Sequence, residues 1–393
     1  MAVTALDDLL ARGVRGARAL VRADLNVPLA GGAVADDTRI RASLPTLRRL
    51  LEAGARVAVV SHLGRPKGVR RAELTLRPVA QRLAGLLAGG VSFCEDCVGA
   101  AARSAVAELG DGQLIMLENL RFHAAEEQND PDFARALAEL ADVYVNDAFG
   151  TAHRAHASTT GVAAFVPEVA AGDLLQSELE HLRVVREPLR PLMVLLGGAK
   201  VSDKLAVLEA LAPRADVLAI GGAMSYTFLV ARGESTGSSL TEPARIADAR
   251  RVMEASSAAG RRLLLPTDHV VAQRAEAGAP ARVVREIPDG WMGVDIGPES
   301  AKRYAEELRA ARTVFWNGPM GIFEIRDFAR GTEQVANAAA ESEAITVVGG
   351  GDSLAAIQQL GIGDRFDHLS TGGGASLEYV QGLELPGVAA LER

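Results

Sequence analysis

Short apolar runs recur along the whole chain, and each is followed by a polar or glycine-rich turn and then by apolar residues at helical spacing. Runs of this length are typical of buried strands, and the segments between them are typical of helices that cover a sheet. The runs are Arg18–Arg22, Arg56–Val60, Val91–Cys94, Leu114–Leu117, Val143–Val145, Met193–Leu196, Val217–Ile220, Leu263–Leu265, Thr313–Trp316, Ile345–Val348 and His368–Ser370. This alternation predicts an α/β protein with parallel sheets flanked by helices.

The length of the chain and a break near its middle indicate two sheets. With 393 residues, of which 48% are hydrophobic, the chain can bury at least two cores. Between about Ala170 and Pro191 the segment GDLLQSELEHLRVV has helical spacing and then meets Pro188 and Pro191. We therefore expect a helix in this region that links the two sheets.

Composition narrows the class of partner. The net charge is −8, which argues against a nucleic acid or an anionic membrane as the partner. No apolar run is long enough to span a membrane, and Met1 is followed directly by AVTALDDLL rather than by a basic, apolar leader. These features predict a cytosolic protein.

The two cysteines form the motif Cys94-Glu95-Asp96-Cys97. This spacing could indicate a redox pair or half of a zinc site. A zinc site would need further ligands, and neither a second C-x-x-C motif nor a His pair at ligand spacing follows. We therefore expect two reduced thiols at the end of a short strand.

Basic residues gather at the strand ends of the first half, where ligands of a parallel sheet bind. Arg39 lies at a helix start, and four further arginines lie at or near strand ends: Arg22, Arg65, Arg121 and Arg154. Each one alone could form a surface salt bridge. Together with His62 and His153 they predict a basic pocket for a small ligand that carries both phosphate and carboxylate. Asp24 and Asn26 could bind hydroxyls of that ligand, although Asp24 could also be a turn residue ahead of Pro28.

The second half has glycine-rich turns at its strand ends instead. Gly349-Gly350-Gly351-Asp352-Ser353 and Ser370-Thr371-Gly372-Gly373-Gly374 each lead into a helical pattern and could form nests of N–H groups around phosphate oxygens. Asp352 is suited to Mg²⁺ and Ser353 to a phosphate oxygen. Glu324 could accept hydrogen bonds from ribose hydroxyls, and four apolar residues beside glycines could enclose a flat base: Met292, Val294, Met320 and Ile322. Any single Gly pair could be a plain turn, but the series predicts a nucleotide.

The stretch from Met193 to Leu208 joins a strand to a helical pattern through paired glycines. Val201, Leu205 and Leu208 recur at helical spacing, which predicts a helix after the turn. The chain has only four lysines, and two of them, Lys200 and Lys204, lie in this turn. A lysine in an arginine-rich chain indicates a place where a compact ammonium is required, such as a phosphate site. The turn is not a Walker P-loop, because the chain has no G-x-x-x-x-G-K-[ST].

Nine motifs, in order and over nearly the whole length, resemble those of the phosphoglycerate kinase family. They are VRADLNVPL, DDTRI, SHLGRPKG, LENLRFH, NDAFGTAHRAHAS, GGAKVSDK, WNGPMGIFE, GGGDS and STGGGASLE. The resemblance implies two Rossmann-like domains, 1–170 for 3-phosphoglycerate and 191–376 for Mg-ATP or Mg-ADP. A hinge helix over 171–190 would join them, and a tail over 377–393 would return to the first domain. It also implies a cytosolic, usually monomeric enzyme of glycolysis and gluconeogenesis.

The resemblance assigns roles to individual residues. Those that match contacts to 3-phosphoglycerate are Asp24, Asn26, Arg39, His62, Arg65, Arg121 and Arg154. Those that match nucleotide or metal contacts are Gly198, Lys200, Lys204, Gly222, Gly293, Asn317, Pro319, Glu324, Gly350, Gly351, Asp352 and Ser353, with Asp352 as the metal ligand. Those that match the groups holding the transferred phosphoryl are Arg39, Lys200, Gly372, Gly373 and Gly374. Ala223 stands where many members have a third glycine, so its amide is given no role.

The chemistry of such a reaction agrees with these residue types. A carboxylate acceptor is already ionised, so no general base is needed, and fixed positive groups must stabilise the charge of the migrating phosphoryl. Three alternatives remain at this point: another carboxylate kinase, a dinucleotide dehydrogenase and a non-catalytic nucleotide-binding module. The first has no need for five arginines beside Asp24 and Asn26, and the second lacks a G-x-G-x-x-G after a strand. The third is disfavoured because all the expected phosphoryl contacts are present.

Overall fold

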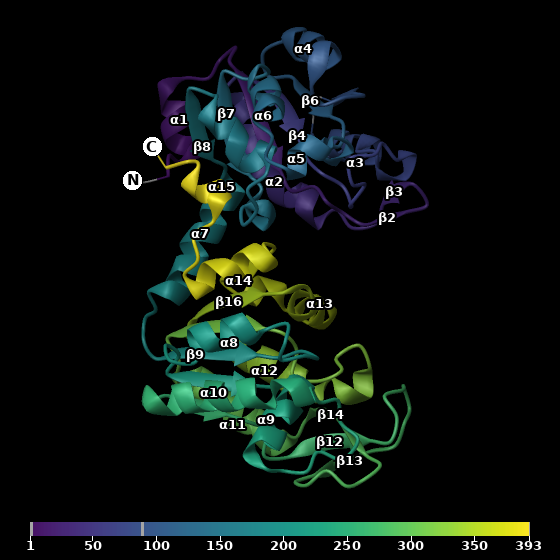
Figure 1. Cartoon of the computed structure of the whole chain (residues 1–393), viewed down its shortest axis with the longest axis vertical. Coiled ribbons are helices and arrows are strands. Elements are labelled where there is room, and N and C mark those ends of the chain that lie inside the picture. Colours follow the sequence, from purple (N-terminus) through teal and green to yellow (C-terminus); the bar gives the residue numbers. More distant parts are fainter. Residues whose placement is uncertain (1–2, 88–89, 393) are drawn as a thin grey trace. The chain divides into compact units, whose positions relative to one another are not determined.

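The computed structural model describes residues 3–87 and 90–392. The chain forms two compact units (Figure 1). The first contains the chain up to Leu179 and again from Glu384 onward, and the second is Glu180–Leu383. The division falls inside helix α7 (Asp173–Arg186), in the segment where a linking helix was expected. None of the described helices is both long and apolar enough to cross a membrane.

The first unit is built on a six-stranded parallel sheet. Its strand order is β5 (Ser92–Cys94), β6 (Leu114–Leu117), β4 (Arg56–Val60), β1 (Arg18–Ala23), β7 (Val143–Asp147) and β8 (Glu168–Ala171). The central strand β1 pairs with β4 and β7, with Leu20 opposite Ala58 and Tyr144. The central strands β1, β4 and β7 are almost completely buried because helices cover both faces of the sheet.

Helices, short turns and one small hairpin surround this sheet. A local signal that sets a boundary is Asp130, whose carboxylate accepts the amides of Asp132 and Phe133 at the start of α6, with Pro131 at the first helical position. The elements are α1 (Leu6–Arg12), β2 (Leu29–Ala30), β3 (Ala33–Val34), α2 (Thr38–Glu52), η1 (Ala72–Leu74), α3 (Arg77–Ala84), α4 (Gly99–Ala107), η2 (Leu120–Phe122), α5 (Ala124–Glu127), α6 (Pro131–Ala138), η3 (Phe149–Thr151), η4 (Ala157–Gly161), η5 (Val162–Ala164) and α15 (Pro386–Ala389). The last of these is fixed in this unit by Gly387, whose N–H donates to Ala152 O at 2.8 Å.

The second unit is built on another six-stranded parallel sheet. Its order is β11 (Arg262–Leu264), β10 (Val217–Ile220), β9 (Leu192–Leu196), β15 (Thr313–Asn317), β16 (Ile345–Gly349) and β17 (His368–Ser370). The chain winds outward from β9 in one direction and, from β15, in the other. The crevice beyond the carboxyl ends of β9 and β15 is therefore the topological switch point at which such sheets bind ligands.

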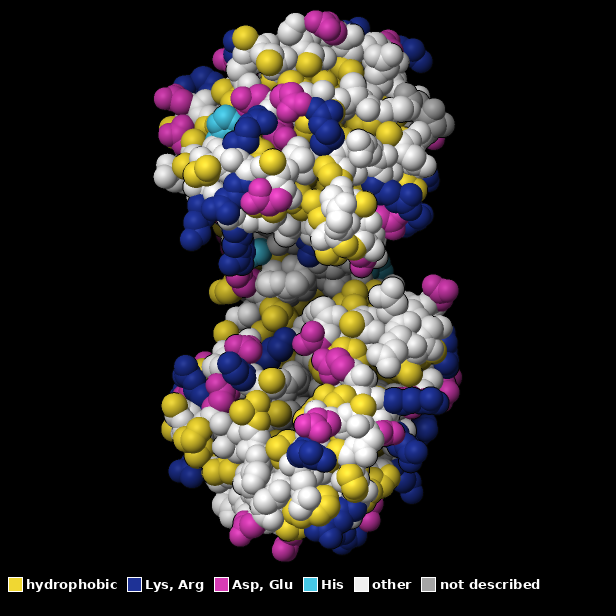
Figure 2. Space-filling model, turned by 90° about the vertical axis from the view of Figure 1, so that its right-hand side faces the viewer, with side chains coloured by type: hydrophobic (Ala, Val, Ile, Leu, Met, Phe, Trp, Pro, Cys, Tyr) yellow, Lys and Arg dark blue, Asp and Glu magenta, His cyan; other side chains and the backbone are white. Residues whose placement is uncertain are grey.

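The helices of the second unit cover this sheet, with Ala- and Leu-rich faces packed inward. They are α8 (Leu205–Leu211), α9 (Met224–Arg232), η6 (Pro243–Arg245), α10 (Ile246–Ala258), α11 (Pro298–Ala310), η7 (Arg326–Phe328), α12 (Arg330–Glu341), α13 (Gly351–Leu360), η8 (Gly363–Arg365) and α14 (Gly374–Gln381). On the face drawn in Figure 2, acidic and basic side chains are interspersed over the surface of each unit.

Three expectations from the sequence are wrong in detail. The second unit also contains an antiparallel sheet of order β13 (Ala281–Val284), β12 (His269–Ala272) and β14 (Met292–Ile296). The pattern of apolar runs did not predict this sheet. Met292 and Val294, expected beside glycines at strand-end turns, instead lie within β14, in which Gly293 interrupts an alternating apolar pattern. Of the three residues at helical spacing, Leu205 and Leu208 lie in helix α8, whereas Val201 lies in the turn that precedes it. The α/β class with parallel, helix-covered sheets is confirmed.

Candidate active site

His62 marks the place in the first unit where the basic side chains converge. It follows the carboxyl end of β4, is 4% exposed, and its Nδ1 lies 3.1 Å from the guanidinium of Arg22. The pKa of His62 lies well below its usual value, first because the ring is buried and then because four positive charges act on it, those of Arg22, Arg121, Arg39 and Arg154. The strand-end arginines therefore form a cluster around one neutral imidazole.

Arg39 and Asp24 form an ion pair within this cluster. Arg39 NH1 donates to Asp24 Oδ2 at 2.7 Å, and the Asp24 side chain is only 10% exposed. Asp24 Oδ1 lies 4.0 Å from His62 Nδ1. Beside them, Asn26 Oδ1 accepts the amide of Gly64 at 2.9 Å, which ties the turn after β1 to the loop after β4. The carboxylate thus fixes a guanidinium beside the cluster rather than only shaping a turn.

Arg121 is buried but not fully hydrogen-bonded. Its NH1 donates to Gly64 O at 2.9 Å. Its Nε lies 3.3 Å from Glu127 Oε1 without hydrogen-bond geometry, so that this buried donor has no hydrogen-bond partner. An unsatisfied buried donor is costly, and an anionic ligand would remove the cost.

Two other predicted residues differ in how the structure places them. Arg154 Nε lies 3.2 Å from His153 Nε2, and Arg154 is one of the four cations that act on His62. Arg65 is exposed on the loop after His62 and makes no hydrogen bond or ion pair with the residues that the structure describes. Its place in the cluster stays a prediction.

The prediction that Arg22 would contribute a fork to a ligand is wrong. Arg22 is completely buried, and its donors are used by Ser158 Oγ at 2.9 Å, by Ala23 O and by His62. Ser158 in turn donates to buried Glu126 at 2.6 Å, and burial raises the pKa of that carboxyl. These buried hydrogen bonds hold Arg22 in place, and Arg22 in turn contacts His62. No pattern in the sequence pointed to Glu126, which lies in the charged segment AAEEQND.

The second unit has a cavity of about 360 Å³ at its switch point. Its walls come from the turns after β9, β10 and β15, from β14 and from α9. The residues are Gly198, Ala199, Gly222, Ala223, Tyr226, Leu240, Ala275, Met292, Gly293, Val294, Asp295, Pro319, Met320, Gly321, Ile322, Glu324 and Asp352. The sequence predicted the glycine and apolar walls but missed Tyr226, Leu240 and Ala275, because these do not follow a parallel strand.

Glycines at this cavity are required by close approach of other groups. A Cβ on Gly222 would lie 2.6 Å from Gly198 N, and Gly222 has φ +65°. A Cβ on Gly293 would lie 1.9 Å from Tyr226 Oη. Both positions therefore admit only glycine without rearrangement.

Several of the predicted polar groups lie at the end of β15, at the start of α13 and just before α8. Of these, Asp352 lines the cavity, whereas Lys204, Asn317 and Ser353 do not. Lys204 Nζ donates to Asn317 Oδ1, while the buried Asn317 Nδ2 has no hydrogen-bond partner. Burial lowers the pKa of Lys204, and the nearby carboxylates of Asp352 and Asp203 oppose that shift. Ser353 Oγ accepts a hydrogen bond from the backbone N–H of Gly318 at 2.5 Å, and this bond fixes the turn after β15. Asp352 is exposed at the rim.

The remaining predicted groups lie on the turns after β9 and β17, two strands of the same sheet that are separated by β15 and β16. Lys200 is exposed on the turn after β9 and makes no hydrogen bond or ion pair among the described residues. Gly373 has φ +55°, and Gly374 opens α14. The amide of Gly372 donates to Ser370 Oγ at 3.3 Å, so it is less available to a ligand than an unbonded amide would be.

The comparisons with known proteins agree with one another. The family model described as phosphoglycerate kinase matches residues 6–383. The phosphoglycerate kinases of Moorella thermoacetica and Rubrobacter xylanophilus are 55% and 57% identical to this chain over 377 and 381 residues. These alignments cover 95% and 96% of this chain and 96% of each relative.

Solved structures give the same result. The phosphoglycerate kinase from Coxiella burnetii is similar with a TM-score of 0.92 at 39% identity, over 99% of both chains. That from Pyrococcus horikoshii OT3 is similar with a TM-score of 0.84 at 34% identity, over 99% of this chain and 98% of that one. The resemblance and the enzyme class predicted from the nine motifs are confirmed. The chain belongs to the phosphoglycerate kinase family.

Proposed function

We propose that this protein catalyses the reversible transfer of a phosphoryl group between ATP and the carboxylate of 3-phosphoglycerate, giving ADP and 1,3-bisphosphoglycerate. The observation that carries the proposal is the convergence of Arg39, Arg121 and Arg154 with Asp24 around the buried ring of His62. A ligand with a phosphate at one end, a carboxylate at the other and a hydroxyl between them matches this mixture of cations and one carboxylate.

The first unit binds 3-phosphoglycerate in this proposal. The unsatisfied Nε of Arg121 supports an anion there. Asp24 and Asn26 take the hydroxyl, and the charged ends are held by His62, Arg39, Arg65, Arg121 and Arg154. His62 acts as a neutral hydrogen-bonding group, since burial and four cations keep its pKa low.

The second unit binds ATP or ADP. The apolar walls at Met292, Val294, Met320 and Ile322 suit a flat base, and Glu324 at the cavity wall suits ribose hydroxyls. The unpartnered Nδ2 of Asn317 and the cation of Lys204 suit the phosphates. The other nucleotide contacts in this proposal are Gly198, Lys200, Gly222, Gly293, Pro319, Gly350, Gly351, Asp352 and Ser353.

Asp352 fits a role as the protein's ligand to Mg²⁺. Its carboxylate is exposed at the cavity rim and close enough to Lys204 to affect the pKa of that lysine. Mg²⁺ is usually held by one or two carboxylates together with substrate phosphates and waters, and a single aspartate satisfies this pattern. When bound, the ion would neutralise charge on the phosphate oxygens.

The protein's own groups then have to position the reactants and stabilise the charge of the migrating phosphoryl. Lys200, Arg39 and the amides of Gly372 to Gly374 are the proposed donors to its equatorial oxygens. The acceptor carboxylate needs no general base. Because the two substrates bind to different units, transfer requires closure about α7, which would also exclude water from the acyl phosphate. X-ray scattering that shows no compaction with both substrates bound would contradict closure.

A coupled assay with 1,3-bisphosphoglycerate and ADP, run with and without Mg²⁺, tests the activity. ATP formation that requires Mg²⁺ is the expected result. Substrate profiling with acetate distinguishes another carboxylate kinase, and an absence of hydride transfer with NAD excludes a dehydrogenase.

The organisation of the protein is also proposed. The domains are 1–170 and 191–376, with a hinge over 171–190 and a C-terminal tail over 377–393. The glycolytic role of the family supports a cytoplasmic enzyme, and we propose a monomer, which light scattering after gel filtration would test.

A further inference from the structure

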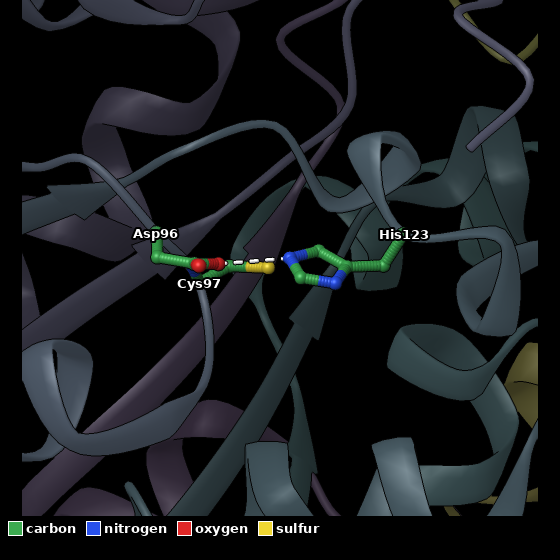
Figure 3. A group of neighbouring side chains, drawn as sticks. All are labelled: Asp96, Cys97 and His123. Carbon is green, nitrogen blue, oxygen red and sulfur yellow. Dashed lines mark hydrogen bonds and ion pairs between the residues drawn. The ribbon is translucent and has the colours of Figure 1, made fainter. Parts of the chain in front are cut away.

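Three side chains of different chemistry meet in the first unit, apart from the arginine cluster. Asp96 and Cys97 lie in the turn after β5, and His123 follows η2, so the group joins two neighbouring strand ends. Their potential ligand atoms all lie within 4.8 Å of one another, and His123 Nε2 is 2.8 Å from Asp96 Oδ1. Figure 3 shows the carboxylate, the sulfur and the imidazole edge pointing toward one another. The sequence shows no second C-x-x-C motif or His pair that could complete a zinc site. In the folded chain, His123 lies beside Asp96 and Cys97 and provides a further potential ligand.

The geometry favours a shared cation over a cysteine nucleophile. In a Cys–His–Asp relay the acid holds one ring nitrogen and the thiol approaches the other. Here the nitrogen that bonds Asp96 also faces the sulfur of Cys97 (Figure 3). One nitrogen cannot take the thiol proton while it is committed to the carboxylate, whereas one metal ion can contact all three groups.

The electrostatic surroundings also favour a cation. Cys97 is completely buried, and the pKa of its thiol lies well above the usual value because of burial and then because of the carboxylates of Asp96, Glu126 and Glu118. Negative charge that opposes a bare thiolate attracts a positive ion to the same place. The side chains of Asp96 and His123 are 42% and 33% exposed, which leaves one side open to solvent.

We propose that this protein binds one Zn²⁺ through Cys97 Sγ, the Asp96 carboxylate and His123 Nε2, with a water as the fourth ligand. Zn²⁺ accepts sulfur, nitrogen and oxygen ligands at about 2.0–2.3 Å, in tetrahedral geometry. Mg²⁺ requires oxygen ligands, so the site is distinct in chemistry from the nucleotide site. The three groups need to draw together only slightly around the ion, because tetrahedral ligands at these bond lengths lie roughly 3.5 Å apart.

Zn²⁺ binding has a defined proton balance. The S–H bond of Cys97 breaks, a Zn–S bond forms, and the proton goes to solvent. His123 must carry its ring proton on Nδ1 for Nε2 to bind the metal, so the contact between Nε2 and Asp96 Oδ1 is replaced by contacts of both groups to the ion. About one proton is therefore released per ion, and affinity rises with pH. The bound ion ties the turn after β5 to the turn that carries Arg121, so it stabilises the first unit.

Co²⁺ and Zn²⁺ are the probes, used with the full chain in a reductant that does not bind metals. One equivalent of Co²⁺ should give a sulfur-to-metal charge-transfer band and tetrahedral d–d bands, and Zn²⁺ should remove both. Calorimetry in two buffers of different ionisation enthalpy should give about one proton released per Zn²⁺. Binding of Co²⁺ without the charge-transfer band would overturn the proposal.

Four variants separate this site from adventitious binding. Cys97→Ser should lose the band, and Asp96→Asn and His123→Asn should each weaken Zn²⁺ binding at least tenfold. The last two change partly exposed side chains, so they test the site even if Cys97→Ser does not fold. Cys94→Ser changes the other buried thiol and should keep wild-type affinity. Unchanged affinity in both asparagine variants, or equal loss in Cys94→Ser, would refute the site. In buffer that contains Mg²⁺ but no Zn²⁺ or Co²⁺, Asp96→Asn should turn over at the wild-type rate.

Discussion

Asp24 Oδ2 accepts a 2.7 Å hydrogen bond from Arg39 NH1, so a carboxylate lies directly against one cation of the arginine cluster around His62. The Asp24 side chain is 10% exposed and that of Arg39 is 36% exposed. The pair is thus open on the arginine side only. Asp24 therefore fixes the direction of the guanidinium and also limits how strongly an anion that lacks a hydroxyl can compete for it.

Replacement of Asp24 tests both effects. Asp24→Asn should raise KM for 3-phosphoglycerate about tenfold, because a charged hydrogen bond to the hydroxyl is worth roughly 1.5–3 kcal/mol. The same change should strengthen inhibition by sulfate, which has no hydroxyl to lose and gains from removal of the negative charge. Steady-state kinetics with and without sulfate measure both. If sulfate inhibition weakens together with substrate binding, Asp24 only holds the local structure.

Lys200 and Arg39 are the side chains proposed to stabilise the transferred phosphoryl. Lys200→Ala and Arg39→Ala should each lower kcat by about 10²–10³-fold, the usual effect of removing one preorganised donor, and Lys200→Ala should change KM much less. Lys302→Ala is the matched control, because Lys302 is a 79% exposed lysine on α11 and should leave kcat unchanged. A Lys200→Ala enzyme with wild-type kcat would remove this lysine from the mechanism.

The basic substrate pocket makes a separate prediction for Arg121. Arg121→Ala should mainly raise KM for 3-phosphoglycerate, because its unsatisfied Nε and its neighbours bind the ground state as well as the transition state. Arg65→Ala tests whether the exposed Arg65 joins the pocket when substrate is bound. Wild-type KM in both variants would contradict the pocket.

Strand positions were predictable because a buried parallel strand requires a continuous apolar run, and such runs are visible in the sequence. The run 313–316, for example, lies within the fully buried β15. The edge strand β8 was missed because Glu168 and Pro167 give it no apolar run. The strand β14 was missed because Gly293, required by the contact with Tyr226, looks like a turn residue.

Site residues that directly follow a strand end could be predicted from the sequence. Buried residues that support the site through contacts formed only in the folded protein could not. His62 and Asp24 converge because β4 and β1 are neighbours, and Arg39 at the start of α2 joins them through its ion pair with Asp24. The buried support of Arg22 by Ser158 and Glu126 could not be read from the sequence, since it depends on which helix covers which strand end.

Asp147 makes stability depend on pH. It is completely buried at the end of β7 and accepts the amides of Leu174 and Leu175 at the start of α7, and burial raises its pKa to about 7. Its pKa in the unfolded chain is about 4, so folding takes up a proton between these values and stability falls as pH rises from about 4 to about 7. Asp147→Asn has no carboxyl group to titrate, so it should not lose stability from this cause as the pH rises. Between pH 5 and pH 8, the calorimetric Tm of the wild type should fall more than that of the variant. An equal fall in both proteins would contradict the prediction that Asp147 is the titrating group.

Gly293 is the position at which a methyl group should be least tolerated. Gly293→Ala would place a Cβ 1.9 Å from Tyr226 Oη in the wall of the second unit's cavity, the proposed nucleotide site. The clash must move β14 or the tyrosine, so we expect ADP affinity to fall at least tenfold and Tm to fall by several degrees. Gly363→Ala is the control, since its Cβ would meet Leu369 at an ordinary 3.4 Å. Wild-type ADP affinity in Gly293→Ala would show that the cavity wall does not bind nucleotide.

Asp295 should make nucleotide affinity depend on pH in the alkaline range. It lines the same cavity, accepts the amides of Ile296 and Gly331 at 2.9 Å and 2.6 Å, and burial raises its pKa to about 8. Below that pH the carboxyl is neutral, and above it a buried negative charge faces an anionic ligand. ADP affinity measured by calorimetry should therefore fall several-fold between pH 7 and pH 9, and Asp295→Asn, which keeps an acceptor in the same place, should give a flat profile. If the variant loses affinity over the same range, the titrating group lies elsewhere.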